Sequence, residues 1–135
     1  MTLVFKARRV FGKDAEGVAL ISTPLSPLGD IDPESGVVKA RDSPAYGERL
    51  AGRVLVMRYM KGSTVGTYVL YALGRRGAAP RAIVVERPDP VLVSGCVLGG
   101  ITLAYGVEQG FFEVVRSGMR IRVSVSTQSV SILDF

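Results

Sequence analysis

Hydrophobic and polar positions alternate with a period of two near the end of the chain. Ile121, Val123 and Val125 alternate with polar residues, a pattern typical of a strand that buries one face against a core. Short apolar runs bounded by Gly or Pro recur along the rest of the sequence and predict further strands. We expect strands at residues 3–10, 18–22, 37–40, 53–57, 82–86, 112–115, 120–125 and 129–133.

One stretch follows the helical period instead. From Val65 to Leu73 the apolar residues recur at spacings of three and four, which places them on one face of a helix. Ser63 is placed to cap the first turn of this helix. Because the helix lies between the expected strands at 53–57 and 82–86, the sequence predicts a strand, loop, helix, strand unit.

The uncharged run at residues 91–107 approaches the length of a membrane-spanning helix. It is shorter than the roughly 20 residues that a span needs, and glycines interrupt it. We expect instead a short buried helix, a turn at Gly99 and Gly100, and a buried strand at residues 101–104. No association with a membrane is expected.

The composition favours a globular protein. The chain has 135 residues, of which 47% are hydrophobic and 21% charged. A chain of this length buries enough apolar surface to fold without a disulfide or a structural metal. Since neither an internal repeat nor a linker is found, we expect one domain covering residues 1–135, with a β-rich α/β fold.

Several chemistries are excluded because their residues are absent. The chain has no His, no Trp, no Asn and a single cysteine, Cys96. It therefore has no Ser-His-Asp triad, no phosphohistidine and no zinc site of its own. Cys96 lies in an apolar stretch, which predicts a buried thiol in a reducing compartment. The residues after Met1 do not form a secretory signal, so a cytoplasmic protein is expected.

The formal net charge is +5, and the basic residues are scattered along the chain. This balance favours an acidic partner or a phosphorylated ligand. A nucleic-acid platform is not favoured, because only 7% of residues are aromatic and no basic stripe is present. A basic binding module that does not catalyse a reaction stays open as a different class of function.

The loop before the predicted helix, RYMKGST at residues 58–64, carries the most suggestive chemistry. It is not a Walker A loop, because Lys61 precedes Gly62 instead of following it. It is not a nucleophile elbow either, because that motif requires glycine at position 61. There remains Ser63 at a helix N-terminus, with a cation and a glycine nearby. Such an arrangement favours an anion, either a substrate group or a serine alkoxide, although a plain capping serine fits the same pattern.

The acidic segment DIDPESG at residues 30–36 resembles a calcium loop only superficially. Gly36 stands at the seventh place instead of the sixth, and Arg41 occupies the place of the bidentate glutamate. We interpret the segment as a tight turn that Asp32 and Pro33 begin and in which Gly36 adopts a positive φ.

Four segments together resemble the stand-alone swivel domains of the aconitase X family, in its archaeal phosphomevalonate dehydratase branch. They are LGDIDPESG (28–36), YGERLAGRVLV (46–56), KGSTVGTYVL (61–70) and AAPRAI (78–83). The resemblance extends from about Gly17 to Gly100. Two positions depart from it: Lys61 stands where many relatives have Arg, and Thr102 stands where Pro is expected.

The resemblance implies an aconitase-type swivelling domain, a barrel-like sheet with flanking helices. It implies the small subunit of a heteromeric hydro-lyase of archaeal isoprenoid synthesis, which dehydrates (R)-5-phosphomevalonate to trans-anhydromevalonate 5-phosphate. The 4Fe-4S cluster would be bound by the large subunit and none by this chain. Ser63 would be the proton acceptor, and Lys61, Gly62 and Thr64 would contact the substrate. Another aconitase X reaction, on a cis-3-hydroxyproline-like substrate, is the alternative within the enzyme class.

Overall fold

The computed structural model describes residues 1–62 and 64–133. Over these residues the strands form one eight-stranded sheet in the order β1-β8-β7-β3-β4-β5-β6-β2. The strands are β1 (Leu3–Lys6), β2 (Arg9–Phe11), β3 (Ala15–Ile21), β4 (Arg53–Met57), β5 (Ala82–Val85), β6 (Thr102–Tyr105), β7 (Arg120–Ser124) and β8 (Ser129–Ile132). The helices are α1 (Pro27–Asp30), α2 (Thr64–Arg75), α3 (Pro90–Gly99) and α4 (Gln109–Val114).

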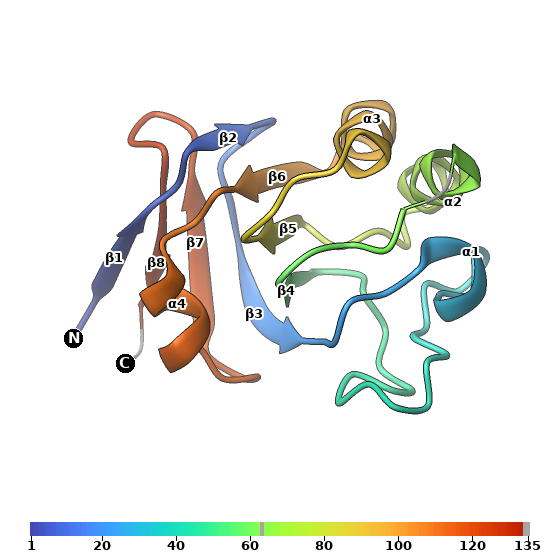
Figure 1. The fold of residues 1–135 in the computed structure, drawn as a ribbon, viewed down its shortest axis with the longest axis horizontal. Helices are drawn as coiled ribbons and strands as arrows, with labels where there is room; N and C mark the ends of the chain where they lie inside the picture. The colour runs from blue at the N-terminus through green and yellow to red at the C-terminus, as the bar shows by residue number, and fades with distance from the viewer. Residues whose placement is uncertain (63, 134–135) are drawn as a thin grey trace.

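The centre of the sheet is parallel and its flanks are antiparallel. β3, β4, β5 and β6 pair in parallel, whereas β7, β8 and β1 on one side and β2 on the other pair antiparallel. The two edge strands, β1 and β2, are joined by only Ala7 and Arg8, so the sheet curves until its edges approach each other (Figure 1). No ladder joins these edges within the described residues, so the mixed α/β sheet with flanking helices is confirmed but is not a closed barrel.

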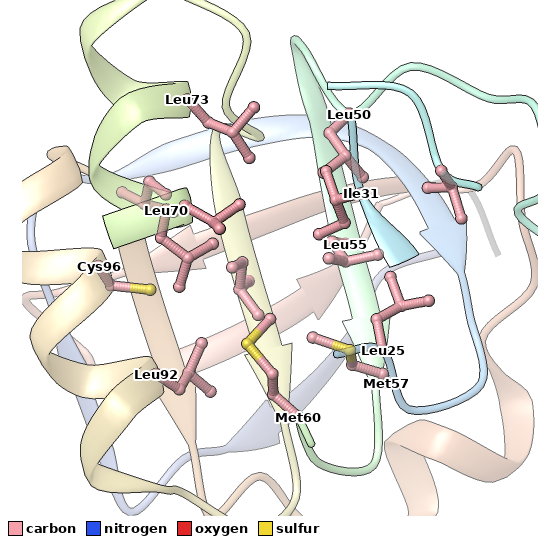
Figure 2. Packing of buried hydrophobic residues seen from close by; sticks show 14 of the residues in the cluster. Leu25, Ile31, Leu50, Leu55, Met57, Met60, Leu70, Leu73, Leu92 and Cys96 are labelled. Carbon is pink, nitrogen blue, oxygen red and sulfur yellow. The ribbon is translucent and has the colours of Figure 1, made fainter. Parts of the chain in front are cut away.

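Each face of the sheet has its own hydrophobic core. Figure 1 shows α1, α2 and α3 on one side of the sheet and α4 on the other. Under the three helices, Leu70 and Leu73 of α2 and Leu92 of α3 pack against Leu55 and Met57 of β4 (Figure 2). On the other face Phe111 of α4 is fully buried among the valines and isoleucines of the sheet.

Helices α2 and α3 lie parallel and very close, because small residues line their contact. A Cβ built on Gly66 would lie 3.1 Å from the Val91 side chain, near the start of both helices. One on Gly74 would overlap the carbonyl oxygen of Gly99, near the end of both. The two helix N-termini therefore lie side by side, at the carboxyl ends of the parallel strands β4 and β5, where α/β folds commonly bind ligands.

The structure confirms most of the predicted elements. The strand, loop, helix, strand unit is present as β4, α2 and β5. The uncharged run forms the short helix α3, a turn with Gly100 at φ 69°, and strand β6. The helix is only partly buried, contrary to the prediction, because Val97 and Leu98 are exposed. No helix among the described residues is both long and apolar enough to cross a membrane.

Three element predictions were wrong. Residues 112–114 belong to the end of α4 and Val115 is its C-cap, because Val107, Phe111 and Val115 follow a spacing of four and are all buried. Residues 37–40 make isolated bridges instead of a strand, although Val38 is buried. Residues 3–10 are divided into β1 and β2, since the chain passes there from one edge of the sheet to the other.

The acidic segment is a tight turn, as predicted. The Asp32 carboxylate accepts hydrogen bonds from the Glu34 amide at 3.0 Å and the Ser35 hydroxyl at 2.9 Å, and Gly36 has φ 72°. The Glu34 amide and the Ser35 hydroxyl lower the pKa of the Asp32 carboxyl. Within the part of the chain that the structure describes, no group of three metal-ligating side chains exists.

Candidate functional site

The principal residue predicted from the sequence, Ser63, lies outside the described residues, as does the side chain of Thr64. What the structure describes is the framework on both sides of it. Helix α2 begins at Thr64, directly after Ser63 in the sequence. Lys61 and Gly62 are both exposed on the preceding loop.

The loop after β4 is held in place by a buried side chain and by a backbone hydrogen bond. Met60 is buried in the core beneath α2 and α3 (Figure 2). The amide of Lys61 donates a hydrogen bond to the Leu25 carbonyl at 2.9 Å, which ties the loop to the segment before α1. The exposed side chain of Lys61 is thus carried on a fixed backbone.

Gly62 touches the loop that leads into α3. A Cβ built on Gly62 would lie 3.0 Å from the carboxyl carbon of Asp89 and closer still to one of its oxygens. The other oxygen, Oδ1, caps α3, accepting hydrogen bonds from the amides of Val91 at 2.7 Å and Leu92 at 3.0 Å. A side chain at position 62 would therefore displace the cap of the neighbouring helix, and only glycine fits without movement.

A second set of contacts joins the same two loops closer to the sheet. The amides of Glu86 and Arg87 both donate to the Arg58 carbonyl, each at 3.0 Å. The Arg58 guanidinium forms an ion pair with Glu86 at 3.3 Å and lies over the Phe112 ring at 5.1 Å. The two loops are consequently held side by side from the strand ends to the starts of the helices.

Arg87 projects from this pair of loops and stacks on an aromatic ring. Its guanidinium carbon lies 4.4 Å from the centroid of the Tyr59 ring, within the range of a cation–π interaction. The stacked guanidinium belongs to an exposed residue. Two cationic side chains, Lys61 and Arg87, thus lie on the loops that precede α2 and α3.

A groove runs along the outer surface between α2 and α3. It has a volume of about 340 Å³ and is lined by Thr67, Tyr68, Pro90, Val91, Ser94 and Leu98. Its apolar walls are unusually open to solvent, since Tyr68 is 71% exposed and Leu98 is 58% exposed. The groove begins beside Gly66 and Val91 and so adjoins the starts of both helices.

This edge of the molecule is suited to an anion. The amides at the start of α3 are occupied by Asp89, whereas the start of α2 follows a loop bearing exposed Lys61 and Gly62. Helix N-termini and nearby cations stabilise negative charge, whether on a ligand or on an ionised hydroxyl. Lys61 and Gly62, two of the predicted site residues, lie on this edge, and their contact with a substrate stays a prediction.

Sequence reasoning missed three residues of this edge: Asp89, Arg87 and Tyr59. For Asp89 a signal existed, because Asp followed by Pro at the first helical position is a common helix start. No local pattern pairs Arg87 with Tyr59, since they come from different loops and meet only when β4 and β5 pair.

Comparisons with known proteins agree with one another. The family described as "Aconitase X swivel domain" matches residues 4–132. A relative from Aeropyrum pernix, named phosphomevalonate dehydratase small subunit, is 47% identical over 90% of this chain and 87% of its own length. One of the same name from Pyrococcus abyssi is 41% identical over 95% of this chain and 97% of its own.

Solved structures with the same architecture are also found. The crystal structure of Thermococcus kodakaraensis aconitase X in its holo-form has a TM-score of 0.90 at 38% identity, covering 98% of this chain and 99% of that one. A solution NMR structure of a UPF0107 protein has a TM-score of 0.85 at 36% identity, covering 99% of this chain and all of the other.

Proposed function

The chain belongs to the aconitase X swivel domain family, and on that premise we propose that it is the small subunit of a cytoplasmic phosphomevalonate dehydratase. The reaction is the loss of water from (R)-5-phosphomevalonate to give trans-anhydromevalonate 5-phosphate. The observation that carries this proposal is the group of relatives with that name, which are 37% to 47% identical over nearly the whole chain. The whole of residues 1–135 would act as one swivel domain.

Within this reaction Ser63 takes a proton. Dehydration removes a proton from the carbon beside the carboxylate and a hydroxyl group from the next carbon, and leaves a double bond and water. A neutral serine is a weak base, so its alkoxide must be stabilised. The start of α2, with exposed Lys61 and Gly62 just before it, supports this role, because a helix N-terminus and a nearby cation favour an oxyanion.

Lys61, Gly62 and Thr64 would contact the substrate around this serine. Gly62 is exposed and has no side chain to cover its backbone, which supports a contact between that backbone and the substrate. Lys61 offers a mobile point charge to an oxyanion, in contrast to the planar fork of arginine.

The iron–sulfur cluster of such an enzyme does not fit this chain. Cys96, the one cysteine in the sequence, is 1% exposed, and burial raises the pKa of its thiol to about 12, whereas a cluster needs several thiolates. We therefore assign the cluster and the departure of the hydroxyl group to the large subunit. The relatives' designation as small subunits supports such a partner, and so does the exposed apolar groove between α2 and α3.

The test is Ser63→Ala in the complex reconstituted with its large subunit. We expect assembly to be retained and turnover of (R)-5-phosphomevalonate to fall by roughly 100- to 10,000-fold, the usual contribution of a general base. Ser126→Ala is the matched control, because Ser126 is exposed in the turn between β7 and β8. The neighbouring Val125 amide donates a hydrogen bond to the Asp14 carboxylate just before β3. This turn therefore lies at the opposite end of the parallel strands from the start of α2.

Two results would contradict the proposal. Near-normal turnover by Ser63→Ala, with a loss of only about 1 kcal/mol in the free energy of unfolding, would reduce Ser63 to a helix cap. Dehydration of a cis-3-hydroxyproline-like substrate in preference to (R)-5-phosphomevalonate would assign the complex to another aconitase X reaction.

A further inference from the structure

We propose that Arg87, held against Tyr59, binds the terminal phosphate of the substrate and thereby selects a phosphorylated substrate over its unphosphorylated form. This rests on the proposed function, since it assigns a part of the same substrate. The phosphate does not react during dehydration, so its binding group needs only position and charge.

The stacking on Tyr59 prepares the guanidinium for an anion. With its guanidinium carbon 4.4 Å from the ring centroid, the Arg87 side chain lies over one face of the Tyr59 ring. Stacking leaves the edges of the guanidinium, which carry the N–H donors, available to a ligand. Two parallel N–H donors match two phosphate oxygens, which is why arginine is favoured where a phosphate is recognised.

The charges at this edge single out Arg87 and Lys61. Arg58 is paired with Glu86 at 3.3 Å, and the Asp89 carboxylate accepts from the α3 amides. Within residues 1–62 and 64–133, neither Lys61 nor Arg87 forms an ion pair with a carboxylate. An incoming phosphate would therefore gain the charge of Arg87 without breaking an existing ion pair.

The position of Arg87 suits the far end of a short substrate. One loop carries Tyr59 and then Gly62, and the other carries Arg87 and then Asp89. The two loops touch at two places: Arg87 lies over Tyr59, and Asp89 lies against Gly62. Tyr59 and Gly62 are three residues apart, so at most roughly 11 Å separates their Cα atoms. Under the proposal a five-carbon substrate extends between these two contacts, with its phosphate at Arg87 and its carboxylate end towards the start of α2.

The experiment compares two substrates in the reconstituted complex: (R)-5-phosphomevalonate and mevalonate, which lacks the phosphate. For Arg87→Ala we expect kcat/KM for the phosphorylated substrate to fall by roughly 10- to 100-fold, the cost of losing a charged hydrogen-bonding partner. The value for mevalonate is expected to stay the same. If mevalonate turns over too slowly, its inhibition constant replaces kcat/KM.

Inorganic phosphate supplies a second readout. As a competitive inhibitor it is expected to bind Arg87→Ala at least several-fold more weakly than the wild type, and Arg87→Lys with intermediate affinity. Arg75→Ala is the matched control, because Arg75 also stacks on a tyrosine, with its guanidinium carbon 5.9 Å from the Tyr71 ring, but at the far end of α2. It is expected to change none of these values.

Tyr59 is a positioning residue under this proposal. Tyr59→Phe keeps the ring and is expected to retain the preference for the phosphorylated substrate, whereas Tyr59→Ala is expected to lose part of it. An equal loss on both substrates in Arg87→Ala, or unchanged phosphate inhibition, would overturn the assignment. Failure of the proposed function is distinguishable, because wild-type complex would then not dehydrate (R)-5-phosphomevalonate, and phosphate binding measured by calorimetry would still test Arg87.

Discussion

At its amino end α2 meets the loop before α3 through Gly62 and the Asp89 carboxylate, whereas at its carboxyl end it meets α3 through Gly74 and the Gly99 carbonyl. Both contacts need glycine, since a Cβ would overlap the neighbour in each case. The chemical groups differ. At the carboxyl end backbone touches backbone, while at the amino end a charged side chain caps a helix next to an exposed loop.

The two stacked arginines repeat this contrast. Arg75 stacks on Tyr71 within the last turns of α2, on a residue four positions away on the same helix. Arg87 stacks on Tyr59 from a different loop, next to the exposed start of α2. An arginine over a tyrosine ring is thus found near both ends of α2. At the carboxyl end it stabilises the helix locally, and at the amino end, under our proposals, it binds a ligand.

Gly62→Ala tests the amino end most severely. The added Cβ would push the Asp89 carboxylate away and move the loop that carries Ser63. Because a shift of about 1 Å at a catalytic group can reduce a rate by roughly 100-fold, we expect a loss of that size in kcat/KM. Steady-state kinetics of the reconstituted complex measures it, and a rate within threefold of wild type would show that the contact does not position the loop.

Gly74→Ala is the counterpart at the carboxyl end. Its Cβ would overlap the Gly99 carbonyl and force the helices apart, so we expect the free energy of unfolding to fall by about 1–3 kcal/mol. Urea unfolding of the isolated chain measures the loss. The folded fraction is expected to assemble and turn over normally. A catalytic defect as large as that of Gly62→Ala would mean that the two ends are not functionally distinct.

Substitutions of Asp89 distinguish the effect of its capping hydrogen bonds from the effect of its negative charge. Asp89→Ala removes the acceptor for the Val91 and Leu92 amides and is expected to cost about 1 kcal/mol of stability. Asp89→Asn retains a capping oxygen and is expected to lose only a few tenths of that. Thermal unfolding of both variants measures the difference, and equal destabilisation would contradict a capping role.

Cys96 lies on α3 between the two ends and makes the stability of the fold depend on pH. Burial raises the pKa of its thiol to about 12. The thiol is therefore neutral in the folded state while the unfolded chain ionises above roughly pH 8.5, so the stability it contributes is lost as pH rises from there towards 12. We expect urea unfolding of the wild type to weaken more between pH 8 and pH 10 than that of Cys96→Ala.

The same burial makes the Cys96 thiol unreactive. We expect thiol reagents at pH 8 to modify Cys96 only after denaturant is added. Rapid modification in buffer would show that α3 opens away from the sheet.

Periodicity was sufficient for α2, because its 12 residues are long enough for the apolar spacings of three and four to be unambiguous. The strand β4 was predicted instead as a short apolar run between Gly52 and the loop that leads into the helix. Periodicity failed at residues 112–115, where a short apolar run fits strand and helix equally well. There burial of Phe111 inside the curved sheet selected the helix. The start of α2 near residue 64 was likewise predicted from the apolar spacing, and the capping and catalytic roles of Ser63 stay predictions.

The sequence by itself determined which segments are strands or helices where the pattern is long, and which chemistries are impossible without histidine and with one cysteine. Only the tertiary structure brought Asp89 to Gly62 and Arg87 to Tyr59. These pairs are separated by more than twenty residues and meet because β4 and β5 pair in parallel and glycines let α2 and α3 approach closely. Local propensity cannot encode such contacts, since they depend on the packing of whole elements.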